Sequence, residues 1–239
     1  MREQILYYAL KYRGEYASMH RAIMRDETWK KVRCDQQYLT ILDEEYPKEL
    51  FLLEYPPYIL FYEGDLTLLK YPKVCVIGSR NCSGYAHNGC HELIRSLDAH
   101  TVIVSGMAKG VDALAHQSAL KLNYRTIGVI GCGLDKSYPK ENAWLYEKMK
   151  SSQLLLSEYP SGTLPLAHHF PWRNRILAAL GEKCYVVEAR NKSGTMITAD
   201  YAQSLNKEVI AFPYRFDDDF GMGCNCLIEQ GAGIFMKER

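Results

Sequence analysis

Lys-Val-Cys-Val-Ile-Gly-Ser-Arg, residues 73–80, joins a short apolar run to a small polar loop. The apolar part, Val74–Ile77, shows no alternation of polar and apolar residues and is rich in β-branched side chains. Such runs are typical of strands covered on both faces, as in a parallel sheet between two layers of helices. The stretch therefore predicts an internal strand of an α/β domain, with Gly78-Ser79-Arg80 at its carboxyl end.

The chain after this strand repeats the same pattern. Five further apolar runs are predicted as strands: Thr101–Val104, Thr126–Ile130, Leu154–Leu156, Tyr185–Val187 and Val209–Phe212. Helices fit the intervals between them: Tyr85–Leu97, Asp112–Leu122, Ala143–Met149, Arg173–Leu180 and Ile197–Leu205. This alternation is typical of a doubly wound sheet with helices on both faces. We therefore expect an extended Rossmann-like α/β fold with a mostly parallel sheet over residues 73–239.

The first 72 residues follow a different pattern. Residues 1–38 have apolar side chains at helical spacings, among them Ile5, Leu6 and Met19, and are predicted to form a short N-terminal helical segment that buries little by itself. Residues 39–72 are rich in proline and tyrosine, which makes a long helix there unfavourable. We expect them to form a connector that carries one strand, Tyr58–Tyr62, and is joined to the core.

Composition limits the possible functions. The 29 basic and 28 acidic residues give a formal charge of +1, so a nucleic-acid site would have to be a local concentration of cations. The eight cysteines are scattered rather than paired in spacing, which indicates reduced thiols. The chain also offers no apolar run long enough to cross a membrane. We therefore expect a cytoplasmic protein without a membrane segment.

Glycine and hydroxyl residues follow several of the predicted strands. Parallel strands bring their carboxyl ends to one edge of a sheet, and small residues there let backbone amides and helix N-termini approach an anion closely. The loops concerned are Gly78-Ser79-Arg80, Ser105–Gly110, Gly131-Cys132-Gly133 and Ser193-Gly194-Thr195. The cations beside them are Arg80, Lys109, Lys140, Arg173 and Arg175. Together they predict a phosphate-binding rim.

Other chemistries lack the residues they need. The loop after Ser105 has no Gly-Lys-Ser/Thr ending of a P-loop, and Gly78-Ser79-Arg80 has no further glycines of the dinucleotide fingerprint. Asp112 and His116 are interpreted as a helix-start carboxylate and a partly buried histidine rather than an acid/base pair. Cys224 and Cys226 have no second ligand pair for zinc. We expect no catalytic residue, no cofactor and no metal.

The order of these loops resembles the DNA-processing protein A family, known as DprA or Smf. The motifs that carry the resemblance are Gly78-Ser79-Arg80, residues 105–112, Ala115-His116, residues 131–135, Tyr138-Pro139-Lys140, Ser157-Glu158-Tyr159, Arg173-Asn174-Arg175, Glu188-Ala189, residues 193–199 and residues 227–232. The resemblance covers about Leu39 to Phe235. It implies a non-enzymatic protein that binds and protects single-stranded DNA, dimerises, and loads RecA recombinase in natural transformation.

The same resemblance assigns roles to individual residues. In the family, the arginine of the Gly-Ser-Arg motif and the lysine after Tyr-Pro line the DNA pocket, which places these roles on Arg80 and Lys140. Lys109, Arg173 and Arg175 are our own additions to that pocket. A homodimer through the C-terminal part is also expected, because that part contains exposed-looking apolar residues: Phe220, Met222 and Leu227.

The chain departs from the family pattern in two respects. Pro213-Tyr214 stands where relatives usually have Pro-Gly, and the chain shows neither a fuller N-terminal helical domain nor a C-terminal winged helix. Two alternatives stay open. One is a nucleotide hydrolase of the phosphoribohydrolase type, with Glu158 or Glu188 as its carboxylate. The other is a scaffold that has lost its DNA pocket but kept its dimer and partner contacts.

Overall fold

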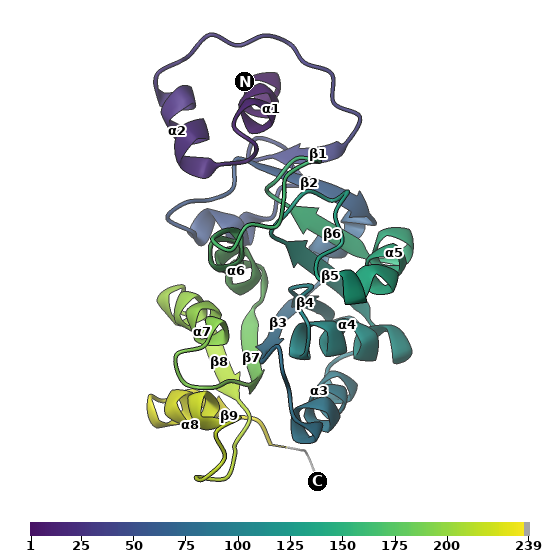
Figure 1. Ribbon diagram of the computed structural model, residues 1–239, viewed down its shortest axis with the longest axis vertical. Coiled ribbons are helices and arrows are strands. Elements are labelled where there is room, and N and C mark those ends of the chain that lie inside the picture. The colour runs from purple at the N-terminus through teal and green to yellow at the C-terminus, as the bar shows by residue number, and fades with distance from the viewer. Residues whose placement is uncertain (237–239) are drawn as a thin grey trace.

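One mixed sheet of nine strands organises residues 1–236, the part of the chain that this computed structural model describes. Its strands are β1 (Gln37–Thr40), β2 (Ile59–Gly64), β3 (Lys73–Gly78), β4 (Val102–Ser105), β5 (Arg125–Ile130), β6 (Leu154–Ser157), β7 (Lys183–Glu188), β8 (Glu208–Ala211) and β9 (Gly233–Ile234). Their order across the sheet is β1-β2-β6-β5-β4-β3-β7-β8-β9 (Figure 1). From β6 to β9 all neighbours are parallel, whereas β2 pairs antiparallel with both β1 and β6.

The six strands predicted after Lys73 are confirmed as β3 to β8. Two strands were not predicted. β1 is four residues long and lies at the edge of the sheet, and β9 has only two residues, so neither carries a clear apolar run. β2 corresponds to the single strand predicted in the connector, which therefore contributes two strands to the sheet.

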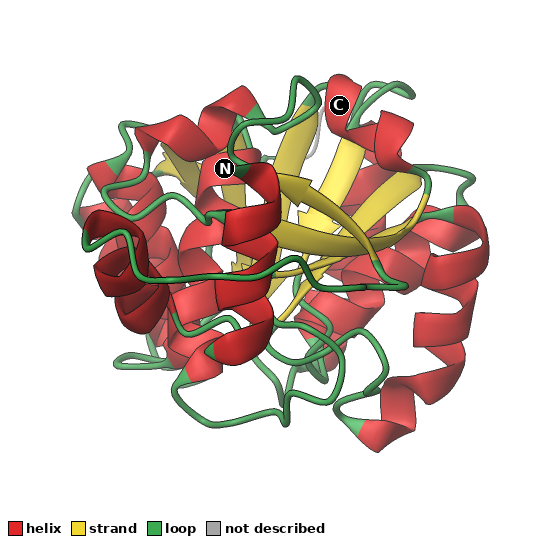
Figure 2. Ribbon diagram, turned by 90° about the horizontal axis from the view of Figure 1, so that it is seen from above, coloured by secondary structure: helices red, strands yellow, loops and turns green. Residues whose placement is uncertain are grey.

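Helices cover both faces of the sheet, as Figure 2 shows from above. They are α1 (Arg2–Lys11), α2 (Tyr16–Met24), α3 (Gly84–Ser96), α4 (Val111–Lys121), α5 (Ala143–Ser152), α6 (His169–Leu180), α7 (Gly194–Ser204) and α8 (Met222–Glu229), with 3-10 turns η1 (Lys48–Leu52), η2 (Leu66–Lys70) and η3 (Lys140–Asn142). α6, α7 and α8 lie on one side of the sheet, and α3, α4 and α5 on the other (Figure 1). The predicted doubly wound α/β fold is thus observed.

Helix α6 begins four residues earlier than predicted, at His169 rather than Arg173. The prediction placed the start later because Pro171 is unfavourable inside a helix. Pro171 lies in the first turn of α6, where a backbone N–H would have no partner in the helix and a proline costs nothing. Helix α8 was not predicted.

The N-terminal helices pack into the same core as the sheet. Ile5, Leu6 and Tyr8 of α1 and Met19 of α2 are buried in a cluster that includes Phe61 of β2 and residues of α5. The segment was expected to bury little by itself, and its burial here depends on β2 and α5. Since β2 pairs with β6, the surface that α1 covers is continuous with the main sheet.

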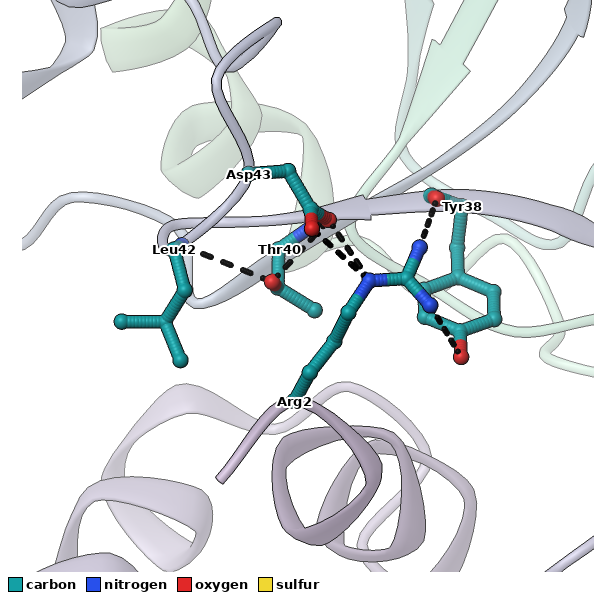
Figure 3. Close-up of polar contacts among 5 residues, drawn as sticks. All are labelled: Arg2, Tyr38, Thr40, Leu42 and Asp43. Atoms are coloured by element: carbon teal, nitrogen blue, oxygen red, sulfur yellow. Dashed lines mark hydrogen bonds and ion pairs between the residues drawn. The ribbon is translucent and has the colours of Figure 1, made fainter.

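A polar cluster also joins α1 to the connector. The Nε of Arg2 donates to both carboxylate oxygens of Asp43, at 2.8 and 3.0 Å, and its two Nη atoms donate to the hydroxyl and the carbonyl oxygen of Tyr38 (Figure 3). Asp43 in turn accepts from the backbone amide of Thr40 at 2.7 Å. These contacts hold the first turn of α1 against β1.

Within residues 1–236, no helix combines the length and the apolar character needed to cross a bilayer.

Candidate nucleic-acid interface

The order of the strands places a crevice beside β3. After β3 the chain adds β4, β5 and β6 on one side, then returns to add β7, β8 and β9 on the other. Ligands of open α/β sheets bind where the winding reverses, outside the carboxyl ends of the strands. The loops that follow β3 and β7 therefore meet at the centre of this edge.

A pocket of about 440 Å³ occupies this position, and we call it the sheet-edge pocket. It lies between the loop after β3, the start of α6, the start of α7 and Arg190, the second residue after β7. Its lining residues with polar side chains are Ser79, Arg80, Asn81, Asp112, Arg173, Asn174, Arg190, Ser193, Thr195 and Thr198. Three arginines and one carboxylate make its wall locally basic.

Glycines let the loops after β3 and β4 touch. Gly110 has φ +73°, and a Cβ there would lie 2.1 Å from the carbonyl oxygen of Ser79, so only glycine fits. The same carbonyl accepts from the backbone amide of Val111 at 3.0 Å. The amide of Ser79 donates to the carbonyl of Glu188 at 2.8 Å. This amide is therefore already used within the sheet and is not available to a ligand.

Arg173 forms the floor of the pocket. Its side chain is only 5% exposed, its Nη1 donates to the carbonyl of Val129, and its Nε has no hydrogen-bond partner. Gly106 separates it from Asp112, since a Cβ there would lie within 2.3 to 2.7 Å of both side chains. Burial lowers the pKa of Arg173, and the Asp112 carboxylate opposes that shift. The floor thus holds a buried cation with an unused donor.

The start of α7 supplies a second unused group. Ser193 precedes the helix, yet its side chain makes no capping bond and its Oγ is buried without a partner. The first amides of a helix, here those of Gly194 and Thr195, have no acceptor within the helix and attract anions. Residues 1–236 contain four buried side-chain atoms without a partner, and two of them, in Arg173 and Ser193, belong to this pocket.

Two exposed arginines stand at the rim. Arg80 is the second residue after β3, and its guanidinium lies 5.8 Å from the ring of Phe170. Arg190 follows β7 closely and lies over the ring of Phe220 at 4.6 Å. Arg190 was missed from the sequence, although it stands after the fifth predicted strand much as Arg80 stands after the first. Phe170 was missed as well, because the helix that carries it was expected to begin later.

A smaller pocket of about 140 Å³ adjoins the first and shares Arg80, Ala108, Phe170 and Arg173 with it. Lys109 lines this side pocket, but its ammonium is paired with Glu141 at the surface. Lys140 is exposed on η3 and follows Pro139, a lining residue; it forms no ion pair with any residue in the described part of the chain. β4 separates β5 from β3 in the sheet, yet Tyr138 and Pro139 of the loop after β5 line the side pocket together with Arg80.

The structure does not bring Arg175 to either pocket. Its side chain is 2% exposed, and its two Nη atoms donate to the two carboxylate oxygens of Glu158 at 2.6 Å each. Its Nε donates to the carbonyl of Tyr55 at 3.1 Å, and its guanidinium lies 4.1 Å from the ring of Trp172. Burial would lower the pKa of Arg175, but Glu158 raises it. This arginine joins α6 to the connector.

The two carboxylates that a hydrolase would require are both engaged. Glu158 pairs with Arg175, and Glu188 is fully buried, where it accepts from the hydroxyl of Ser83 at 2.5 Å and from that of Tyr214 at 3.2 Å. These bonds hold the start of α3 against the end of β7. Neither carboxylate lines the sheet-edge pocket or the side pocket.

Asp112 and His116 do not form an acid/base pair. His116 is fully buried; its Nε2 donates to the carbonyl of Gly106 at 2.8 Å, and its Nδ1 lies 2.6 Å from the hydroxyl of Thr126. Burial lowers its pKa to about 4, so it is neutral at pH 7. The sequence predicted a partly buried histidine, whereas His116 is fully buried, and Asp112 lines the pocket. No cluster of potential metal ligands occurs in residues 1–236.

Comparison with known proteins places this geometry in context. The sequence model of the family described as DNA recombination-mediator protein A matches residues 37–239. DNA processing protein DprA of Streptococcus pneumoniae is 45% identical over 195 residues, which are 82% of this chain and 69% of that protein. Protein Smf of Synechocystis sp. is 40% identical over 207 residues, which are 84% of this chain and 52% of that protein. The chain thus spans from about half to about two thirds of these relatives.

Two solved structures are similar as well. The X-ray structure of DNA processing protein A from S. pneumoniae matches with a TM-score of 0.83 and 37% identity, over 98% of this chain and 90% of that one. A structure of DNA processing protein A from Helicobacter pylori, which concerns its single-stranded DNA binding mode, matches with a TM-score of 0.76 and 35% identity, over 84% of this chain and 91% of that one.

Proposed function

Because this chain belongs to the DNA recombination-mediator protein A family, we propose that it binds single-stranded DNA, protects it on entry, and loads a RecA recombinase on it during natural transformation. The relative from H. pylori, studied for its single-stranded DNA binding mode, supports the first part. The observation that carries the proposal is the sheet-edge pocket, where a buried arginine and a helix-start serine both keep a polar atom without a partner. As all eight cysteines are free thiols, we assign the protein to the cytoplasm.

A phosphate in this pocket would lie beside both of its unpartnered groups. The charge of Arg173 would attract it from the floor, the Oγ of Ser193 would donate to it once the side chain turns toward the cavity, and the first amides of α7 would add the positive end of the helix dipole. Arg80 and Arg190 would bind from the rim, since a guanidinium fork matches the oxygens of a phosphate. These contacts are to the backbone of DNA, so they would not depend on base identity.

The proposed DNA contacts differ from the sequence-based set in two respects. They retain Gly78, Ser79, Arg80, Lys109, Lys140, Arg173 and Ser193-Gly194-Thr195, with Gly78 and Ser79 shaping the loop rather than donating to the ligand. They omit Arg175, which is buried against Glu158, and add Arg190.

We further propose a homodimer through the C-terminal edge of the sheet. Of the residues named from the sequence, Leu227 is 0% exposed, and Phe220 and Met222 are partly buried. The exposed apolar side chains of this region are Phe216, Ile234 and Met236. Ile234 belongs to β9 and Met236 is the second residue after it, whereas Phe216 lies in the loop between β8 and α8. Among the described residues no strand pairs with the outer edge of β9, so this edge can accept a strand of a second copy.

The experiment is a fluorescence anisotropy titration with a labelled oligonucleotide, single- and double-stranded in parallel, over a range of salt concentrations. We expect tighter binding of the single strand, and loss of that binding at physiological salt in the variant Arg80→Glu/Lys140→Glu. Removal of one cation that binds a phosphate should lower the salt slope of log affinity by about 0.7. The control is Lys121→Glu/Lys148→Glu, which makes the same charge change on α4 and α5 outside both pockets.

Parental affinity and salt slope in the folded Arg80→Glu/Lys140→Glu variant would place the DNA site elsewhere. Hydrolysis of nucleotides by the purified protein, abolished by Glu158→Gln or Glu188→Gln, would favour the hydrolase alternative instead.

A further inference from the structure

A second concave surface lies on the far side of the first turn of α6. This groove has a volume of about 880 Å³ and runs between α2 and α6. The lining residues that matter below are Glu15, Tyr16, Arg21, Arg25, Tyr55 and Trp172. We call it the α2–α6 groove. None of the phosphate contacts proposed above involves a residue of this groove.

Aromatic rings held in place by one another form the base of the groove. Tyr16 stacks on Tyr58, with ring centroids 5.2 Å apart and 17° between the planes, and meets Tyr55 edge-on at 5.7 Å. Tyr55 also lies 5.9 Å from Trp172, whose ring contacts the buried Arg175. The side chain of Tyr55 stays 43% exposed, so this preset cluster offers an aromatic ring to the solvent.

The groove is also basic on the side of α2. Arg21 and Arg25 are four residues apart, hence on one face of the helix, and both line the groove. Neither forms an ion pair with any residue in the range 1–236. The one carboxylate in the lining, that of Glu15, accepts from the amides of Ala17 and Ser18 at the start of α2. These bonds, which oppose the effect of burial, lower the pKa of Glu15 and hold its charge at the helix end.

The groove adjoins the proposed DNA site across the first turn of α6. Phe170 lines the sheet-edge pocket, whereas its neighbour His169 lines the groove. The Nδ1 of His169 donates to the carbonyl of Gly131 in the side pocket at 3.0 Å, and its ring stacks on Tyr159 at 4.0 Å. Only the first turn of α6 therefore separates the two surfaces.

We propose that the α2–α6 groove is a second subsite for single-stranded DNA, in which bases stack on Tyr55 and phosphates bind Arg21 and Arg25. This inference rests on the function proposed above and extends its site along the strand. Exposed aromatic rings beside a line of cations are the features with which proteins bind single strands irrespective of sequence. A strand held by a phosphate in the sheet-edge pocket would cross the start of α6 and enter the groove.

The test compares oligo-dT of about 4 and about 16 nucleotides, lengths at the two ends of the range of single-strand sites. The short strand can fill only the sheet-edge pocket, whereas the long one can reach the groove. We expect Tyr55→Ala to weaken binding of the long strand roughly tenfold and to leave that of the short strand unchanged. This substitution keeps the backbone carbonyl that Arg175 uses. In Arg21→Gln/Arg25→Gln the salt slope of the long strand should fall by about 1.4.

The control Lys121→Gln/Lys148→Gln removes the same charge from α4 and α5 and should bind both strands as the parent does. A long strand with 5-iodouracil bases should give photo-crosslinks to Tyr55, Tyr16 or Trp172. If the groove variants bind both lengths with parental affinity while Arg80→Glu/Lys140→Glu binds neither, the groove is not a subsite and the proposed function stands. If the parent protein binds neither strand, both proposals fail.

Discussion

Replacement of Arg175 tests whether this arginine of α6 stabilises the fold or contacts DNA. In Arg175→Met, Glu158 would remain buried, at 4% exposure, without the two 2.6 Å bonds that neutralise it. Removal of one partner from a buried ion pair costs about 3–5 kcal/mol of unfolding free energy. For a domain of this size, that corresponds to a fall of roughly 6–20 °C in melting temperature. The double variant Arg175→Met/Glu158→Leu should recover much of the loss, because no charge is left buried.

The matched comparison is Arg190→Met. Arg190 is exposed and contacts only the ring of Phe220 among the interactions of the described residues, so its loss should cost less than about 1 kcal/mol. It lines the sheet-edge pocket, however, and its loss should weaken binding of single-stranded DNA. Thermal unfolding should therefore show a lower melting temperature for Arg175→Met but not for Arg190→Met. Anisotropy titration well below the melting temperature should show weaker DNA binding for Arg190→Met but not for Arg175→Met.

The result that would refute this reasoning is a folded Arg175→Met protein that melts with the parent but has lost its affinity for DNA. Arg175 would then contact the ligand, as the sequence pattern first indicated, and the bonds to Glu158 would contribute little.

Three further predictions concern pH, a loop glycine and assembly. Lowering the pH from 6.5 to 4 should reduce the unfolding free energy by up to about 3 kcal/mol. His116 has a pKa of about 4 in the folded chain, so over this range the unfolded chain takes up a proton that the folded chain largely does not. In urea titrations the unfolding free energy of His116→Gln should decline less steeply with falling pH, and equal declines would contradict this prediction. Gly110→Ala should cost at least about 1 kcal/mol and weaken DNA binding, whereas Gly84→Ala, which has open space around it, should melt as the parent does. Light scattering should give twice the chain mass of 27.4 kDa, with a monomer for Ile234→Asp, and a monomeric parent would exclude the dimer.

Much of the fold followed from local pattern. Continuous apolar runs predicted the six strands from β3 to β8, because a strand covered on both faces must be apolar on both sides. The glycine and hydroxyl loops were expected at one sheet edge, and the structure brings Gly78, Ser193 and Arg80 to one pocket there. The short edge strands β1 and β9 and the burial of α1 could not be predicted in this way. They depend on partners distant in the sequence rather than on their own composition.

Arg173 and Arg175 show most clearly what the sequence determined and what it did not. They stand two positions apart on a helix, so their side chains point about 200° apart around its axis. The sequence therefore already implies that the two arginines lie on different faces of α6. Which of them faces the pocket depends on how α6 packs, and that is set by Glu158 and Tyr55 on one side and Val129 and Gly106 on the other. The amino-acid sequence determined that cations stand beside the glycine and hydroxyl loops at the sheet edge. Only the tertiary structure decided which of them is neutralised by a buried carboxylate, because burial and ion pairing arise from residues that the fold brings together.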